Sequence, residues 1–276
     1  MVGSHPSFSV VLPTYSGDVP SELCQSIESL ANQTILPDEL FIIKDGPLTD
    51  DLESTIEEKS KAFPTTIRTH QIEKNRGLGH ALQVGIKNCT YNIVARMDAD
   101  DISVPSRFEQ QITFLDKNPE VDVIGGYIEE FDPVTSSIIA RREVPTSHEE
   151  IKRLAKFRSP INHGTVMLNK EMVLSAGNYR DVDRMEDYDL WVRMLLNGAR
   201  FANLPEVLVK VRAGKKMYER RGGWEYAREE IRTQVEFYRR GFISPPIFVF
   251  NVITRTPLRL VPNRIRGVIY KTFARD

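Results

Sequence analysis

Ser9-Val10-Val11-Leu12-Pro13-Thr14-Tyr15 is a short, valine-rich run that ends at a proline and polar residues. The run is too short for a typical helix and rich in β-branched residues, so it predicts a buried strand. A helical stripe of apolar residues follows over 23–31, and a second run, Leu40-Phe41-Ile42-Ile43, stops at Asp45-Gly46-Pro47. Strand, helix and strand in this order are typical of the βαβ unit of a parallel sheet.

The same alternation continues to about residue 125 and then loosens. The pattern predicts further helices over 50–62, 78–86 and 105–115, and further strands over 66–72, 91–95, 121–124 and 127–131. Beyond residue 132 we expect a hairpin-like stretch, an irregular segment over 157–168, helices over 170–176, 186–197 and 224–238, and a boundary at Gly241. The chain is therefore predicted to be an α/β protein with a mainly parallel sheet, which becomes α+β in its second half.

Composition excludes several classes of protein. The 276 residues are 41% hydrophobic, enough for a sizeable core, and their net charge of −1 argues against a protein that holds nucleic acid through global charge. Two cysteines are too few for a disulfide scaffold or a zinc cluster. With no secretory leader and no apolar run near the roughly 18 residues of a membrane span, we expect a cytoplasmic protein.

The run Asp98-Ala99-Asp100-Asp101 follows the strand predicted over 91–95. In an open parallel sheet, ligands bind beyond the carboxyl ends of the strands. Three carboxylates within four residues repel one another unless a cation lies among them, and oxygen ligands suit Mg²⁺ or Mn²⁺. A solvated turn is the alternative. The sequence contains neither G-x-G-x-x-G after the first strand nor a P-loop, which excludes those dinucleotide and nucleotide sites.

A second acidic cluster, Glu186-Asp187-Tyr188-Asp189, opens a predicted helix. Leu190, Trp191, Met194 and Leu195 lie three, four, seven and eight residues after Asp187, so Asp187 is expected on the apolar stripe and Glu186 at its edge. A half-buried carboxylate with raised proton affinity makes a suitable general base. The alternative is that the acids only favour the helix N-terminus through the macrodipole.

Taken together, these motifs resemble glycosyltransferase family 2 enzymes with the GT-A fold. The resemblance covers about residues 8–212 and rests on Ser9 to Tyr15, Glu28-Ser29-Leu30 to Gln33-Thr34, Asp45-Gly46, Asn75-Arg76-Gly77, Met97 to Asp101, and Glu186 to Trp191. Bacterial exopolysaccharide, capsule and lipopolysaccharide transferases of the amylovoran-biosynthesis type are the most similar. The resemblance implies a Rossmann-like sheet and inverting transfer of a hexosyl or N-acetylhexosaminyl group from a nucleotide sugar, usually a UDP-sugar, with Mn²⁺ or Mg²⁺.

The resemblance also implies roles for the residues that would hold the nucleotide. Pro13, Thr14 and Tyr15 would line the base pocket, Asp45 would hydrogen-bond the base or ribose, and Arg76 would lie near the nucleotide. One departure from the family pattern is that the paired acids usual after the second strand are here Lys44-Asp45, which leaves only the second acid.

For the chemistry, the resemblance assigns Asp98, with Ala99, to the ribose or donor sugar, Asp100 to the metal in a DXD-type motif, and Asp187 to deprotonation of the acceptor hydroxyl. Glu186 is the neighbouring candidate for the same role. GT-A enzymes often supply a further metal ligand from a late histidine, but the last histidine here is His163. The rest of the metal ligands are therefore not assigned.

Two further residues have both a functional and a structural interpretation. His163, in the irregular segment, is a candidate contact for the acceptor or donor sugar and equally a structural histidine. Trp191 is a candidate for stacking on a sugar, but its place on the apolar stripe favours packing in the core.

We expect residues 8–125 to form the nucleotide-sugar-binding half, 126–241 the acceptor-binding and catalytic half, and 242–276 a helical, basic, amphipathic extension. A metal-dependent sugar nucleotidyltransferase is one alternative function, since acidic metal sites also serve phosphoryl chemistry. A non-catalytic nucleotide-sugar-binding subunit is another. The expected partners are a nucleotide-sugar donor and a saccharide or lipid-linked acceptor.

The C-terminal extension interleaves apolar residues with cations over 247–275. One interpretation is an interfacial segment, with apolar side chains in the headgroup region and cations near an anionic leaflet at the cytoplasmic face. The alternative is an element packed on the catalytic domain with solvated arginines. Pro257 and Pro262 predict short helical pieces rather than one continuous helix.

Overall fold

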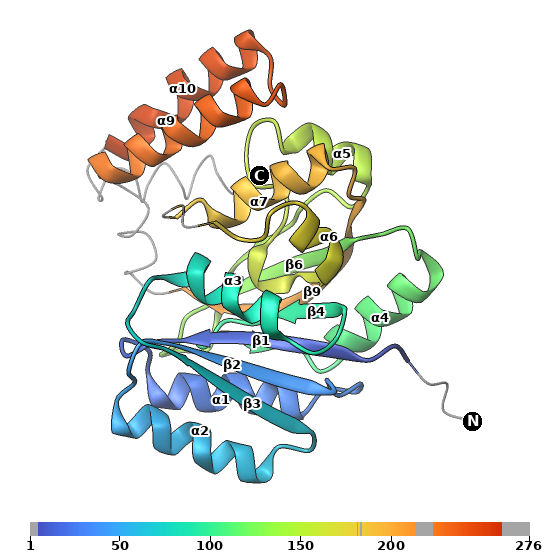
Figure 1. Cartoon of the computed structure of the whole chain (residues 1–276), viewed down its shortest axis with the longest axis vertical. Helices are drawn as coiled ribbons and strands as arrows, with labels where there is room; N and C mark the ends of the chain where they lie inside the picture. Colours follow the sequence, from blue (N-terminus) through green and yellow to red (C-terminus); the bar gives the residue numbers. More distant parts are fainter. Residues whose placement is uncertain (1–4, 181, 183, 214–222, 261–276) are drawn as a thin grey trace.

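The computed structural model describes residues 5–180, 182, 184–213 and 223–260 (Figure 1). Within these residues nine strands form one mixed sheet in the order β3-β2-β1-β4-β8-β6-β9-β5, with β7 paired to β6. The strands are β1 (Phe8–Thr14), β2 (Glu39–Asp45), β3 (Thr66–Ile72), β4 (Ile93–Arg96), β5 (Ile102–Ser103), β6 (Val123–Phe131), β7 (Ile138–Arg142), β8 (Met167–Asn169) and β9 (Phe201–Arg212). The helices are α1 (Pro20–Ala31), α2 (Asp50–Ala62), α3 (Leu78–Asn88), α4 (Arg107–Lys117), α5 (His148–Leu154), α6 (Lys170–Ser175), α7 (Glu186–Leu196), α9 (Trp224–Arg239) and α10 (Pro245–Leu260), with a short 3₁₀ turn at His163–Thr165.

The parallel half of the sheet follows the predicted βαβ order. β3, β2, β1 and β4 pair in parallel, with Val10 opposite both Leu40 and Ala95. Alternate residues face opposite cores because successive side chains of a strand point to opposite faces. Val10 and Leu40 join the cluster with apolar residues of α1, α2 and α4, whereas Val11 and Phe41 join the cluster with those of α3, α6 and α7. Figure 1 shows α1 and α2 on one side of these strands and α3 on the other. The expectation of a mainly parallel sheet in this half is confirmed.

The second half of the sheet is mixed, and one prediction there was wrong. β8 is antiparallel to both β4 and β6, and β9 is parallel to β6. The two strands predicted over 121–124 and 127–131 are one strand, because Gly125 and Gly126 continue it rather than turn the chain. A Cβ on Gly125 would lie 2.5 Å from the Asn203 Oδ1 atom, and one on Gly126 would lie 2.5 Å from the Leu208 Cδ1 atom. The glycines therefore let β9 pack closely against β6.

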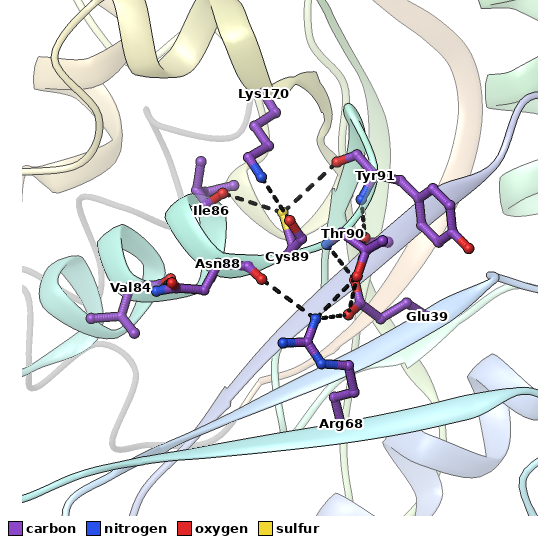
Figure 2. Close-up of polar contacts among 10 residues, drawn as sticks. Glu39, Arg68, Val84, Ile86, Asn88, Cys89, Thr90, Tyr91 and Lys170 are labelled. Carbon is purple, nitrogen blue, oxygen red and sulfur yellow. Dashed lines mark hydrogen bonds and ion pairs between the residues drawn. The ribbon is translucent and has the colours of Figure 1, made fainter.

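The amino-terminal edge of the parallel strands is fixed by a polar network (Figure 2). Glu39 is 2% exposed and accepts hydrogen bonds from the Ser9 hydroxyl, the Thr90 amide and hydroxyl, and the Arg68 guanidinium. Burial alone would raise the pKa of Glu39, but these hydrogen bonds lower it below its ordinary value. Nearby, burial raises the pKa of the Cys89 thiol to about 11. This edge is therefore structural, and Cys89 is not a nucleophile at neutral pH.

α9 and α10 form a helical hairpin at one end of the molecule (Figure 1). α10 runs through Pro257, so the prediction of short pieces was wrong over the part of the tail that the structure describes. Proline removes only one helical hydrogen bond here, close to the end of α10, while Asn251, Arg255 and Arg259 tie α10 to α9. Residues 261–275 of the predicted interfacial segment lie outside the described residues.

Candidate active site

The loop after β4 carries the first acidic cluster and is held by a buried arginine. Arg96, the last residue of β4, is 4% exposed and donates from both terminal nitrogens to the two carboxylate oxygens of Asp98. Burial alone would lower the pKa of the Arg96 guanidinium, but the charge of Asp98 keeps it raised. The Ser26 hydroxyl donates to the Asp98 carbonyl over 2.8 Å. Sequence reasoning missed Arg96, although its place two residues before Asp98 was a usable signal.

Asp100 and Asp101 experience the repulsion predicted for this run. Asp100 keeps part of its surface in solvent, yet the atoms packed around it and the charge of Asp98 raise its pKa to about 6. Asp101 is 4% exposed, and burial together with the charges of Asp98 and Asp100 raises its pKa well above the ordinary value. The Arg212 amide donates to Asp101 over 3.3 Å, which uses one of its oxygens.

This donor set fits a divalent cation held mostly by other ligands. The described residues contain no group of three acidic, histidine or cysteine side chains arranged to hold a metal ion by themselves. Mg²⁺ is commonly held by one or two carboxylates, with phosphate oxygens and water completing the octahedron. Asp100 meets that requirement because it is open to solvent on one side and is crowded by anions on the other. Such a site does not need the late histidine that GT-A enzymes often supply and that this sequence lacks after His163.

The loop after β1 lies beside the loop after β4, which carries Asp98, Asp100 and Asp101 and is called the acid loop below. Asp18 accepts hydrogen bonds from the Thr14 hydroxyl over 2.9 Å and from the Tyr15 amide over 3.0 Å, which closes a tight turn. Burial and the charges of Asp98 and Glu22 raise the pKa of Asp18. Thr14 is buried, as is Pro13 before it, while the Tyr15 ring is 37% exposed. The Tyr15 ring is therefore the part of the predicted base pocket that a ligand can reach, and Asp18 is a second residue that sequence reasoning missed.

Asp45 organises the neighbouring loop. It is 5% exposed, and its two carboxylate oxygens accept hydrogen bonds from the Arg76 amide over 2.9 Å and the Gly77 amide over 2.8 Å. Gly46 has φ +89, and a Cβ there would lie 2.7 Å from the Asn75 amide nitrogen. The close approach therefore requires glycine. Asp45 thus positions the loop that carries the exposed Arg76 side chain.

The first turn of α7 carries the second acidic cluster. Asp187 accepts a hydrogen bond from the Ser159 hydroxyl over 3.2 Å. Burial raises the pKa of Asp187, while hydrogen bonds from Tyr188 and Ser159 lower it in part. Glu186 and Asp187 are both half-buried, so burial does not separate them as the helical stripe predicted. Their surroundings differ, since a Cβ on Gly79 would lie 3.3 Å from Glu186, which places Glu186 at the start of α3.

His163 and Trp191 contact each other at the floor of this region. The His163 Nε2 atom lies 2.8 Å from the Tyr179 hydroxyl, and the His163 ring lies 5.8 Å from Trp191, edge to face. Burial and the charge of Arg96 hold the pKa of His163 well below its ordinary value, so the imidazole is neutral. Trp191 is fully buried and has no face for a sugar, so its burial supports the core interpretation over stacking.

The two acidic clusters meet around Arg96. A Cβ on Gly164, beside His163, would lie 3.4 Å from an Arg96 nitrogen and 3.5 Å from the carboxylates of both Asp98 and Asp101. The charges that act on the Arg96 guanidinium include Asp98, Asp101 and Glu186. The structure thus brings the acid loop, the 3₁₀ turn and the start of α7 into one polar site, which is chemically suited to holding an anionic ligand through a cation and to accepting a proton.

Two curated relatives match nearly the whole chain. One is the amylovoran biosynthesis glycosyltransferase AmsE of Erwinia amylovora, 39% identical over 96% of this chain and 98% of its own length. Another is an Escherichia coli protein named UDP-Gal:alpha-D-GlcNAc-diphosphoundecaprenol beta-1,3-galactosyltransferase, 39% identical over 98% of this chain and 97% of its own length.

Solved structures share the fold at low sequence identity. A complex of S. aureus TarS with UDP-GlcNAc aligns with a TM-score of 0.68 and 19% identity, over 96% of this chain and 76% of that chain. The mannosyltransferase PcManGT of Pyrobaculum calidifontis, in complex with GDP-Man and Mn²⁺, aligns with a TM-score of 0.66 and 16% identity, over 98% of this chain and 76% of that chain. The family model for glycosyl transferase family 2 matches residues 9–177, and the chain belongs to that family.

Proposed function

We propose that this glycosyltransferase moves a hexosyl or N-acetylhexosaminyl group from a UDP-sugar to a saccharide or lipid-linked saccharide acceptor during cell-surface polysaccharide biosynthesis. Support for the donor and acceptor classes comes from the full-length relative whose name specifies a UDP-sugar donor and a lipid diphosphate acceptor. Residues 8–125 would bind the nucleotide sugar and residues 126–241 the acceptor. The reaction would take place at the cytoplasmic face of the membrane.

The meeting of the two acidic clusters around Arg96 carries the proposal. The acid loop suits a nucleoside-diphosphate sugar, because Arg96 fixes the orientation of the Asp98 carboxylate and the Asp100 side chain is exposed to solvent. The start of α7 suits the acceptor, because Asp187 is a carboxylate whose pKa burial raises. Glycosyl transfer needs the donor site and the acceptor site side by side. Acids of both clusters interact with the buried Arg96 guanidinium or lie next to residues that contact it.

In the proposed mechanism, Asp187 removes the proton from the acceptor hydroxyl while that oxygen attacks the anomeric carbon from the face opposite the diphosphate. A single displacement of this kind inverts the anomeric centre. Mn²⁺ or Mg²⁺, when bound through Asp100, offsets the negative charge of the leaving diphosphate. Arg96 fixes the Asp98 carboxylate toward the donor, and the Asp45 hydrogen bonds hold the loop of Arg76 beside the nucleotide.

Product analysis tests the proposal directly. The purified protein is incubated with each of a panel of nucleotide sugars, Mn²⁺ and a lipid diphosphate saccharide, and the products are separated. Glycosyl transfer yields free nucleoside diphosphate and an acceptor that is longer by one sugar. The anomeric carbon of the transferred sugar then has the configuration opposite to that in the donor. In a parallel incubation with a nucleoside triphosphate and a sugar 1-phosphate, release of pyrophosphate would instead identify a nucleotidyltransferase. If the protein binds a nucleotide sugar but transfers it to none of a panel of saccharide and lipid-linked acceptors, the protein is a non-catalytic subunit.

A further inference from the structure

The outer face of α10 is apolar and exposed. Val249, Phe250 and Ile253 lie within one turn of each other and are 51%, 55% and 66% exposed. Phe157, from the segment after α5, is 36% exposed and lies with its ring 6.1 Å from that of Phe250. Isolated apolar side chains on a surface are ordinary, but four in one patch mark a contact surface.

Two arginines of α10 form ion pairs with α9 and are not exposed beside this patch. Arg255 and Arg259 both pair with the carboxylate of Glu230 on α9, which is 1% exposed. The sequence interpretation of these two arginines, either as membrane contacts or as solvated charges, was therefore wrong. They connect the helices of the hairpin instead, because a buried carboxylate requires cationic partners.

A different segment, next to Phe157 in the chain, supplies exposed cations. Lys152, Arg153 and Arg158 are all exposed and flank Phe157 in the chain. Two hydrogen bonds fix this segment to α10. The Asn251 side chain donates to the Lys156 carbonyl over 2.8 Å, and Arg255 donates to the Phe157 carbonyl.

Few acids oppose these cations. The described residues from Phe237 to Leu260 include no aspartate or glutamate. On α9, Glu229 and Glu236 form ion pairs with Arg232 and Arg240. Glu149 and Glu150 are exposed and lie two to four residues before Lys152 and Arg153 on α5, so they offset part of the charge of those two cations but lie farther along the chain from Arg158. An apolar helix face bordered by cations is the arrangement that binds at the surface of an anionic bilayer.

The segment that carries Phe157 contacts the turn that carries the candidate base. Ser159, which donates to Asp187, directly follows Arg158. Tyr188, next to Asp187, donates through its hydroxyl to the Ala155 carbonyl over 2.8 Å, and the Arg255 guanidinium lies 5.6 Å from its ring centre. A membrane at this surface would therefore lie beside the part of the site that takes the acceptor.

We propose that Phe157, Val249, Phe250 and Ile253, bordered by Lys152, Arg153 and Arg158, form a docking face for an anionic lipid bilayer. Docking by this face brings the Asp187 side of the site to an acceptor anchored in that bilayer. The second statement rests on the proposed function, whereas the first stands on the surface alone. The composite face replaces the continuous C-terminal segment that the sequence indicated.

Sedimentation with vesicles tests the face without any transfer reaction. The full chain is mixed at low salt with vesicles of phosphatidylglycerol and phosphatidylcholine, or of phosphatidylcholine alone. We expect binding to the anionic vesicles, at least a tenfold loss of affinity in Phe250→Ser/Ile253→Ser, and little binding to the neutral ones. The matched control is Val134→Ser/Ile138→Ser, which removes two exposed apolar residues from the β6–β7 hairpin and should bind as the wild type does.

The cations are tested in the same way. Lys152→Gln/Arg153→Gln/Arg158→Gln should weaken binding to anionic vesicles by about fivefold for each cation removed. Lys87→Gln/Lys117→Gln/Lys210→Gln removes three exposed cations elsewhere and should leave most of the binding intact. Losses of the same size in both triple variants would show attraction by net charge alone and would overturn the docking face.

Other outcomes separate the face from the proposed function. Unchanged vesicle binding in Phe250→Ser/Ile253→Ser, or no binding by the intact chain, would overturn the face. A third outcome would also overturn it. If light scattering shows that the intact chain is a dimer that does not bind vesicles, and Phe250→Ser/Ile253→Ser converts the dimer to a monomer, the surface is the contact with a second copy of the chain. Vesicle binding as expected with no transfer to any acceptor would keep the face and contradict the function. Transfer to a short water-soluble acceptor should be unchanged in the variant.

Discussion

The acid loop after β4 and the first turn of α7 have similar compositions but different surroundings. In the loop, burial and the charge of Asp98 raise the proton affinity of Asp100 and Asp101, while Asp98 itself pairs with the buried guanidinium of Arg96. In α7, Asp187 has a hydroxyl donor and a helix N-terminus, and burial is the main cause of its raised pKa. Crowded carboxylates are suited to a cation, while a separated and half-buried carboxylate is suited to accepting a proton. The comparison indicates that the environment of an acid, and not only its presence in a motif, decides the chemistry for which that acid is suited.

The largest expected effect comes from removing the proposed base, Asp187. Asp187→Asn should lower transfer by about 10²- to 10⁴-fold, because an amide cannot accept the acceptor proton. Initial rates with saturating donor measure this change, and donor binding by calorimetry should remain nearly that of the wild type. Glu186→Gln is the matched control, since it changes the neighbouring acid of the same turn. If Glu186→Gln causes the larger loss, the roles of the two acids are reversed.

Removal of the proposed metal ligand, Asp100, should have the next largest effect. Asp100→Asn should reduce transfer by about 10²-fold at low Mn²⁺ and recover partly at high Mn²⁺, because the site loses one anionic ligand. Chelator should abolish wild-type activity, and added Mn²⁺ or Mg²⁺ should restore it. Asp116→Asn, at an exposed acid of α4, serves as the control. Full wild-type activity in chelator would contradict the metal assignment, and with it the distinction between the two clusters.

A smaller effect is expected where the two clusters meet. Arg96→Met leaves the Asp98 carboxylate without its cation, and we expect a loss of about 2 kcal/mol in the free energy of unfolding. This is less than the value for a fully buried pair, because the Asp98 side chain is 26% exposed. Donor affinity should fall by about tenfold, since the freed carboxylate would lie beside the diphosphate of the proposed donor.

Denaturant unfolding and calorimetry measure the two quantities separately for Arg96→Met. Arg141→Met is the control, because Arg141 is an exposed arginine paired with an exposed glutamate. If stability falls while donor affinity is unchanged, Arg96 supports the fold and does not position the Asp98 carboxylate for the donor.

The extent to which the sequence predicted the molecule differs between its parts. The parallel half was predictable because Val10, Val11 and Leu40 lie in short apolar runs whose spacing has few interpretations. The continuity of β6 was not, because Gly125 and Gly126 have the composition of a turn and only the approach of β9 explains them.

The candidate site divides in the same way. Its acids were identifiable because they are grouped in the chain, whereas Arg96, Asp18 and Ser159 act through partners in space. Arg107 is a further example. It is fully buried, donates to the Arg96 carbonyl over 2.8 Å, and burial lowers its pKa to about 9. Nothing in its sequence surroundings distinguishes it from a solvated arginine at the start of a helix.

The smallest expected effect concerns the hydroxyl that supports the base. The Ser159 hydrogen bond stabilises the ionised form of Asp187, so Ser159→Ala should raise the pKa of Asp187 further. Since the base must be ionised, activity is present above that pKa and is lost as the pH falls through it. The transfer rate of the variant should therefore differ from that of the wild type by less than about threefold at pH 8. As the pH is lowered, the variant should lose activity at a higher pH than the wild type does. Rate profiles between pH 5 and pH 9 measure the shift, with Ser137→Ala, an exposed serine of the β6–β7 turn, as the control. An acid limb at the same pH in both variants would mean that Ser159 does not tune the base, and that the environment of α7 differs less from that of the acid loop than the contacts indicate.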